Sequence, residues 1–354
     1  MKHNITIGDR LKGAANYLWR EGTVYIILLF LIVFFTILNP VFFTAKNFYN
    51  LLTQSTYYII AGMGIAFVMM SGGIDLSVGC EMAMVSTTSA IFLQTYAALH
   101  DGNCPWWIIL VVVLWAVLLG FAMGALNGVL AAKLKIFPLI ITIATSEVFK
   151  GICYTITQAK TYSGLPETFR AIYKVKFLGL PVDVYITIFI VIATWFVLNK
   201  THFGRNVLAV GGNRECSRLS GIKADMVQIL CFGITGAVFG LASLDMMAQQ
   251  NMTSASTGPG TEFTCLTAAI IGGVSMMGGK GNVIGLVCGI FVMQIISTGM
   301  QMAGWGTYLQ YAVKGIILIA AIGFDAIKAR PRPIIRVHEE LAKPIAEEKE
   351  AAQV

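Results

Sequence analysis

Charged side chains are scarce in this sequence. Only 12% of its 354 residues are Asp, Glu, Lys or Arg, whereas 56% are hydrophobic. Average soluble domains carry roughly 25% charged residues, so a soluble body of 38.4 kDa could not cover its surface with this supply. A mean hydropathy of +0.75 agrees. The scarcity of charge excludes a soluble protein and predicts an integral membrane protein in a lipid bilayer.

Signatures of catalysis and metal binding are also missing. The four histidines show no HExxH spacing, the seven cysteines contain no CxxC pair, and there is no GxSxG. A P-loop pattern fails around Lys280, because Val274 occupies the first glycine position and Gly281 follows the lysine. We therefore expect no catalytic residue, no metal site and no cofactor in this chain, and we interpret the cysteines as small buried hydrophobes.

Charge-free windows divide the chain into possible membrane helices, each of which needs about 20 mainly apolar residues. Ten spans are predicted near residues 24–43, 51–71, 80–99, 106–131, 137–158, 182–199, 226–244, 263–279, 283–302 and 306–324. Basic residues gather at the two ends of the chain, at Lys133 and Lys135, and in the loop 200–225. These positions place both termini in the cytoplasm, although four basic residues within 159–182 oppose this topology.

The expected fold is thus an all-α integral membrane protein, with about ten helices in a compact bundle that contains broken or re-entrant segments. Residues 1–23 form a cytoplasmic segment, 24–324 the transmembrane domain and 325–354 a charged cytoplasmic tail. The net charge of +7 is explained by this topology. Its basic residues flank hydrophobic spans, so we expect no nucleic-acid partner.

Glycine is abundant, and its spacing indicates close helix contacts. Small residues four apart let helix backbones approach each other in lipid. The alternative is that glycine is simply common in membrane helices. Two ladders have this spacing: Gly120, Gly124 and Gly128, and Gly281, Gly285 and Gly289.

The segment 71–79 interrupts an apolar run with Gly72-Gly73 and an acidic residue, Asp75. An ionisable residue in a membrane segment is a functional candidate, but Asp75 could instead cap the helix that follows it. Glu81 could face the same cavity or an interface. A second glycine-rich break runs over residues 258–281 and predicts a short or re-entrant segment.

Three further charged residues lie within predicted spans. Glu147 and Lys150 are three residues apart on one helix, so we expect a structural ion pair, with a role in lining the path as the alternative. Lys314 has no local partner. It should pair with Asp75, Glu81 or Glu147 across the bundle, or extend to an interface.

The loop 200–225 is expected to contain a short helix. Asn213 is a suitable N-cap, Glu215 falls in the first turn, where the helix dipole favours an anion, and Gly221 can end the helix. A structured helix between two spans suggests a docking element for another protein. A solvated positive-inside loop is the simpler alternative.

Several segments together resemble the permease subunits of ribose/galactose/xylose-type ABC importers, over roughly residues 20–328. The similar segments are Gly72-Gly-Ile-Asp-Leu-Ser-Val-Gly79, Phe203-Gly-Arg205, Ala209-Val-Gly-Gly-Asn213, Arg218-Leu-Ser-Gly-Ile222, the stretch 268–281, and Tyr311-Ala-Val-Lys-Gly315.

The resemblance implies a multi-pass permease of the bacterial inner membrane, working as a homodimer or a paralogous heterodimer. Its partners would be a cytoplasmic ATPase, which holds the ATP and Mg²⁺, and an extracytoplasmic sugar-binding protein. The 200–225 loop would then be the ATPase-coupling element. Its coupling residues would be Gly211, Gly212, Asn213, Glu215, Arg218, Leu219 and Gly221.

A neutral sugar needs polar groups that match its hydroxyls, but a conduit must not bind it tightly. Sparse polar residues suit such a translocation path, and we predict that Gln54, Asp75, Ser77, Glu81 and Asn127 line it. Two alternatives stay open. One is a cation-coupled secondary transporter that uses Asp75, Glu81 or Glu147 as its ion site. The other is a permease of the same ABC family that carries a nucleoside, an autoinducer or a polyol.

Overall fold

The computed structural model describes residues 22–329, so the predicted segment 1–23 and tail 325–354 lie almost wholly outside it. Within this range the chain is built from helices, joined by short loops and two small two-stranded sheets. The elements in chain order are α2 (Thr23–Leu38), η1 (Pro40–Phe42), α3 (Ala45–Met70), α4 (Val78–Leu99), α5 (Trp106–Leu134), α6 (Pro138–Thr157), β1 (Tyr162–Ser163), α7 (Glu167–Lys174), β2 (Lys176–Phe177), β3 (Leu180–Pro181), α8 (Val182–Lys200), α9 (His202–Gly212), α10 (Arg214–Leu219), α11 (Ala224–Gln250), β4 (Met252–Thr253), α12 (Thr261–Ile271), α13 (Val283–Met302) and α14 (Thr307–Ala329).

Eight of these helices are long and apolar enough to cross a membrane: α3, α4, α5, α6, α8, α11, α13 and α14. Two shorter apolar helices, α2 and α12, fall where two further spans are predicted. The all-α membrane class is confirmed. The span predicted over 263–279 is instead a helix of 11 residues, because the chain leaves the helix at Gly272 and Gly273, where φ reaches +86°.

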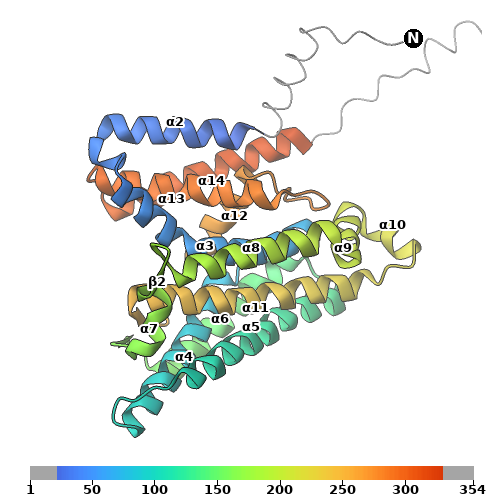
Figure 1. The fold of residues 1–354 in the computed structure, drawn as a ribbon. Coiled ribbons are helices and arrows are strands. Elements are labelled where there is room, and N and C mark those ends of the chain that lie inside the picture. Colours follow the sequence, from blue (N-terminus) through green and yellow to red (C-terminus); the bar gives the residue numbers. More distant parts are fainter. Residues whose placement is uncertain (1–21, 330–354) are drawn as a thin grey trace, which may run out of the picture.

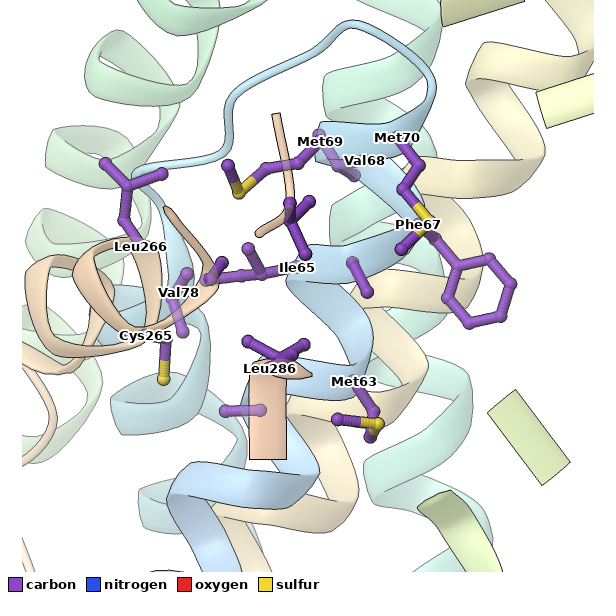
Figure 2. Close-up of a cluster of buried hydrophobic side chains, with 14 of the residues drawn as sticks. Met63, Ile65, Phe67, Val68, Met69, Met70, Val78, Cys265, Leu266 and Leu286 are labelled. Carbon is purple, nitrogen blue, oxygen red and sulfur yellow. The ribbon is translucent and has the colours of Figure 1, made fainter. Parts of the chain in front are cut away.

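The helix α3 lies at the centre of the bundle. It packs against α11 and α8 on one side and against α12 and α13 on the other, and α2 and α14 lie beyond α13 and α12 (Figure 1). Its second half is enclosed by apolar side chains, which Figure 2 shows together with residues from α4, α12 and α13. Thr53, Ser55 and Thr56 on α3 are therefore buried against other helices, whereas Lys46, Asn50 and Gln54 in its first half are exposed.

The glycine ladders lie where helix backbones touch. A methyl group added at Gly120 would overlap the Gly236 carbonyl of α11, and one at Gly124 would overlap the Phe232 carbonyl. In the second ladder, Gly285 and Gly289 face the backbone of α12 in the same way. These close contacts hold α5 against α11, and α12 against α13. The remaining members, Gly128 and Gly281, meet Ile229 of α11 and Met70 of α3.

A chain break after α3 lets α4 begin inside the bundle. α3 ends because Gly72 takes a left-handed conformation (φ +85°) and the N–H of Gly73 bonds back to the Val68 carbonyl at 2.9 Å. The chain then reverses, so that α4 starts at Val78, next to the loop that leads into α12. The predicted break over 71–79 is therefore a real interruption between two helices.

Candidate functional site

A polar pocket of about 360 Å³ lies between α3, α11, α13 and α14, and we call it the glutamine pocket. This volume falls within the range of small-molecule sites. Gln54 lies 16 residues, or roughly 24 Å of helix, before Met70, which contacts α9. The pocket therefore lies toward the end of the bundle that is opposite α9 and α10. Its lining residues are Gln54, Tyr57, Tyr58, Gln249, Gln250, Gln294, Ser297, Thr298, Gln301, Gln310 and Lys314.

Helical periodicity explains why these residues share one cavity. On α3, residues 54, 57 and 58 have the i, i+3, i+4 spacing of one helix face, and on α13 residues 294, 297, 298 and 301 continue it by another turn. The two α3 tyrosine rings lie 4.1 Å apart between centroids. Two polar faces and a pair of aromatic rings are thus turned toward each other inside an apolar bundle.

The amide groups of the pocket are held by bonds from their nitrogen atoms. Gln294 donates from Nε2 to Gln54 Oε1 at 3.3 Å, and Gln310 donates to the Trp305 carbonyl at 3.1 Å. Gln249 donates to Thr56 Oγ1 at 2.6 Å. Because the nitrogen atoms are engaged, the carbonyl oxygens of Gln249, Gln294 and Gln310 are left to accept hydrogen bonds from a ligand.

Two buried acids lie beside the Thr56 hydroxyl that binds the amide of Gln249. Thr56 donates to Asp245 Oδ2 at 2.6 Å and lies 3.5 Å from Asp183 Oδ2, and Gln249 Nε2 is also 3.2 Å from Asp245 Oδ2. Asp183 is 1% exposed and Asp245 6%. Sequence reasoning missed both acids, although each stands at the edge of a charge-free window, which is the signal that could have found them.

Of the five residues predicted to line the translocation path, only Gln54 is in the glutamine pocket. The other four meet in a separate, buried cluster where α4 begins. Ser77 Oγ lies 2.5 Å from Asp75 Oδ1 and 2.9 Å from Glu81 Oε1, and Asn127 of α5 donates to Ser77 and Glu81 at 2.9 and 3.0 Å. None of the four is more than 3% exposed.

The other three charged residues that were predicted within spans lie in two different places in the structure. Lys150 lies 3.6 Å from Glu147 on α6, as the structural ion pair requires. Lys314 lines the glutamine pocket, and none of the ion pairs within residues 22–329 includes it. Its expected partners Asp75 and Glu81 lie in the other cluster.

At the far end of the bundle, α9 and α10 form a short helical projection (Figure 1). Gly279 donates its N–H to the Met70 carbonyl at 3.0 Å, and Gly211 of α9 packs against both groups. The projection is therefore in direct contact with the end of α3 and with the loop that follows α12.

The helix α10 presents charge and one apolar side chain to the outside. Asn213 caps it by accepting from Cys216 N at 2.9 Å, Glu215 pairs with Arg218 at 2.7 Å, and Leu219 is 79% exposed. Gly221 follows with φ +83°, which turns the chain away from the helix. Gly212 beside α10 lies close to Gly279, where an added methyl group would stand 2.7 Å from Gly212 Cα.

Comparison with known proteins shows which family this chain is similar to. Residues 47–322 match the model of the family described as "Branched-chain amino acid transport system / permease component". The D-allose transport system permease protein of Escherichia coli K12 is 31% identical over 87% of this chain and 92% of its own length. The galactose/methyl galactoside import permease protein of the same strain is 30% identical, over 90% and 97%. The ribose import permease protein of Bacillus subtilis 168 is 31% identical, over 85% and 91%.

No solved structure matches the chain at a comparable level of significance. The family match covers most of the described bundle, including the glutamine pocket, the buried cluster at the start of α4, and the α9–α10 projection. The chain therefore belongs to this family of transport-system permease components, and it is a multi-pass protein of the bacterial inner membrane.

Proposed function

We propose that this chain forms the translocation path of an ATP-driven importer of a monosaccharide, and that the glutamine pocket contacts the sugar on its way. Three amide carbonyls are left to accept hydrogen bonds there, and two tyrosine rings offer an apolar face. A sugar carries hydroxyl donors around an apolar ring, so both features match it. The free carbonyls are the single observation on which the choice of cargo rests.

The same pocket disfavours a zwitterionic amino acid, which the family description would suggest. An α-ammonium group buried in a protein needs an acidic partner. No acidic side chain lines the pocket, Asp245 is covered by Gln249, and Lys314 would repel the ammonium. A neutral hydroxylated solute meets no such charge, in keeping with the printed names of the allose, galactose and ribose permeases.

Coupling to ATP is assigned to the 200–225 loop. In this proposal Gly211, Gly212 and Asn213 shape the approach to α10, Glu215, Arg218 and Leu219 contact a groove of a separate cytoplasmic ATPase, and Gly221 ends the helix. ATP and Mg²⁺ belong to that ATPase, and this chain contributes no catalytic residue and no cofactor. A second permease copy or a paralogue, and an extracytoplasmic sugar-binding protein, would complete the importer.

This arrangement implies an orientation and a division of the chain. The projection of α9 and α10 lies in the cytoplasm, together with residues 1–23 and 325–354, and residues 24–324 form the transmembrane domain. The glutamine pocket then lies toward the extracytoplasmic side, where the binding protein would release its sugar. A gradient-driven secondary transporter is the competing mechanism, and the family does not favour it.

Uptake by whole cells that depend on this chain tests the proposal. We expect uptake of at least one of labelled D-allose, D-galactose and D-ribose, and no uptake of L-leucine. Uptake should stop when ATP is depleted while the proton and sodium gradients are maintained. Uptake of L-leucine, of a nucleoside alone or of a polyol alone would contradict the assignment of cargo, and uptake without ATP would contradict the mechanism.

A further inference from the structure

The starts of two helices face each other within the bundle. α4 begins at Val78, and α12 begins at Thr261. A methyl group built on Gly79 would stand only 2.7 Å from the Gly258 carbonyl and from Pro259, so the two starts are in backbone contact. Each helix start carries a partial positive charge. Negative side chains are therefore favoured here, but the partial charges of two helix starts can balance only a limited number of them.

Two carboxylates bond to backbone N–H groups at these helix starts. Asp75 Oδ1 accepts from Ser77 N at 2.8 Å, ahead of α4, and Glu262 Oε1 accepts from Gly260 N at 2.8 Å, ahead of α12. Carboxylates that accept backbone N–H groups are stable in the ionised form. Each helix start thus already has one anion.

Glu81 is a third acid at the same junction, and its contacts differ. Its carboxyl group touches only the Ser77 hydroxyl and the Asn127 amide, and it is fully buried. The charged groups that face the cluster from other elements are acidic, namely Glu262 of α12. On α6, Lys150 is engaged with Glu147. In the part of the chain that the structure describes, no cation pairs with Glu81.

The Ser77 hydroxyl has too few hydrogen atoms for its neighbours. Its oxygen lies 2.5 Å from Asp75 Oδ1 and 2.9 Å from Glu81 Oε1, and it already accepts from Asn127 Nδ2 at 2.9 Å. One hydroxyl hydrogen can serve only one of the two carboxyl groups. If it is donated to Asp75, the contact between Ser77 and Glu81 needs a hydrogen on Glu81.

Asn127 supplies a second and independent observation. It comes from α5, it is fully buried with its amide directed into the cluster, and its Oδ1 has no hydrogen-bond partner. Its Nδ2 donates to both Ser77 Oγ and Glu81 Oε1, so the amide directs N–H hydrogens toward the Glu81 carboxyl group, where they would repel a metal cation.

From these contacts we propose that the junction of α4, α5 and α12 contains a proton-binding site, and that Glu81 holds the proton at neutral pH. The carboxylic O–H of Glu81 donates to Ser77 Oγ, while Ser77 donates to ionised Asp75. Loss of the proton would leave two anions around one hydroxyl, far from water. The ligand of this site is a proton, and sodium is the alternative occupant that the test must distinguish.

Infrared spectroscopy of the purified full chain in lipid nanodiscs at pH 7 tests the proposal. A free glutamic acid is ionised at this pH, since its pKa is about 4.3. We expect wild type to show C=O absorption of protonated carboxylic acid, and one component of it should be missing from Glu81→Gln. Absorption from the buried acids Asp183 and Asp245 should be the same in the variant. Glu147→Gln removes an exposed, ion-paired glutamate from α6 and should leave the absorption unchanged.

Labelling wild-type protein with ¹³C-glutamate gives a second measurement that requires no variant to fold. The component that is lost in Glu81→Gln should shift with labelled glutamate and stay in place with labelled aspartate. Absence of a glutamate-sensitive component in wild type would overturn the assignment. Thermal unfolding gives a third measurement. Because the folded state keeps a proton that glutamate in the unfolded chain loses at about pH 4.3, the stability of wild type should fall as pH rises above that value, and that of Glu81→Gln should fall less.

Sodium chloride separates the two occupants in the same preparation. If sodium binds, replacing potassium by sodium at constant ionic strength raises the unfolding temperature of wild type and not that of Glu81→Gln, and the proton assignment is wrong. If a proton binds, the two salts give the same temperature. None of these measurements depends on sugar uptake, so the result is independent of the proposed cargo.

Discussion

The contact between α5 and α11 offers the sharpest test of how this bundle is held together. A methyl group at Gly124 would overlap the Phe232 carbonyl oxygen, and it would stand 3.0 Å from both Gly236 N and the Phe232 carbonyl carbon. Relaxed contacts to carbon need about 3.5–4.0 Å. Gly124→Ala should therefore force the two helices roughly 0.5 Å or more apart.

This separation affects the whole interface and not only the added atom. A radial gap of about 0.5–1 Å forfeits a quarter to a half of the dispersion energy of each contact it opens, and overpacked sites typically lose about 1–3 kcal/mol. Gly124→Ala should be destabilised by that amount. Gly151→Ala is the matched control: it is also a helical glycine, but a methyl group there would meet nothing within 4 Å. It should gain about 0.5–1 kcal/mol from its better helix propensity.

Thermal unfolding of both variants in the same detergent, followed by size-exclusion chromatography with fluorescence detection, measures the difference. We expect Gly124→Ala to lose folded protein at a lower temperature than wild type, and Gly151→Ala at an equal or higher one. If Gly124→Ala is as stable as wild type, or if both variants lose the same amount, backbone contact at the ladder does not hold these helices together.

Two further predictions concern the coupling helix and the support of the pocket. Glu215→Arg and Arg218→Glu should each abolish copurification of the ATPase. The double variant restores the ion pair within α10, but it should still fail to bind the ATPase. Recovery of binding in the double variant would assign these residues to helix stability alone. Thr56→Val removes the hydroxyl between Asp245 and Gln249, so that the buried Asp245 loses the shorter of its two hydrogen bonds. This loss should cost about 1–3 kcal/mol and lower the unfolding temperature, and maximal sugar uptake should fall as well. Thr56→Ser keeps the hydroxyl and should restore both properties, and equal defects in the two variants would count against the role of the hydroxyl.

Much of the fold could be predicted because the signals are local. Runs without charge mark each apolar helix, and Gly72-Gly73 marks the end of α3 because the bend there requires positive φ. The end of α12 was placed too late. The residues after Gly272 include Val274, Met276 and Met277, so hydropathy alone continues the span through a loop.

The sites were harder to predict, because they depend on contacts between distant helices. Ser77 and Glu81 are four residues apart, so the start of one helix brings them together, but Asn127 joins them only through the packing of α5 on α4. The polar face at 294, 297, 298 and 301 is visible as a helical repeat in the sequence. That it faces Gln54 could not be known without the position of α3 beside α13.

Maximal uptake of the accepted sugar by Gln294→Leu tests the central claim most directly, with Gln94→Leu as a control outside the glutamine pocket. Because a separate binding protein is proposed to capture the sugar, the half-saturating concentration should stay that of wild type in both variants. The account predicts that the maximal rate falls at least several-fold in Gln294→Leu and is retained in Gln94→Leu, at equal amounts of protein in the membrane. An unchanged maximal rate in Gln294→Leu would show that the sugar does not pass through the glutamine pocket.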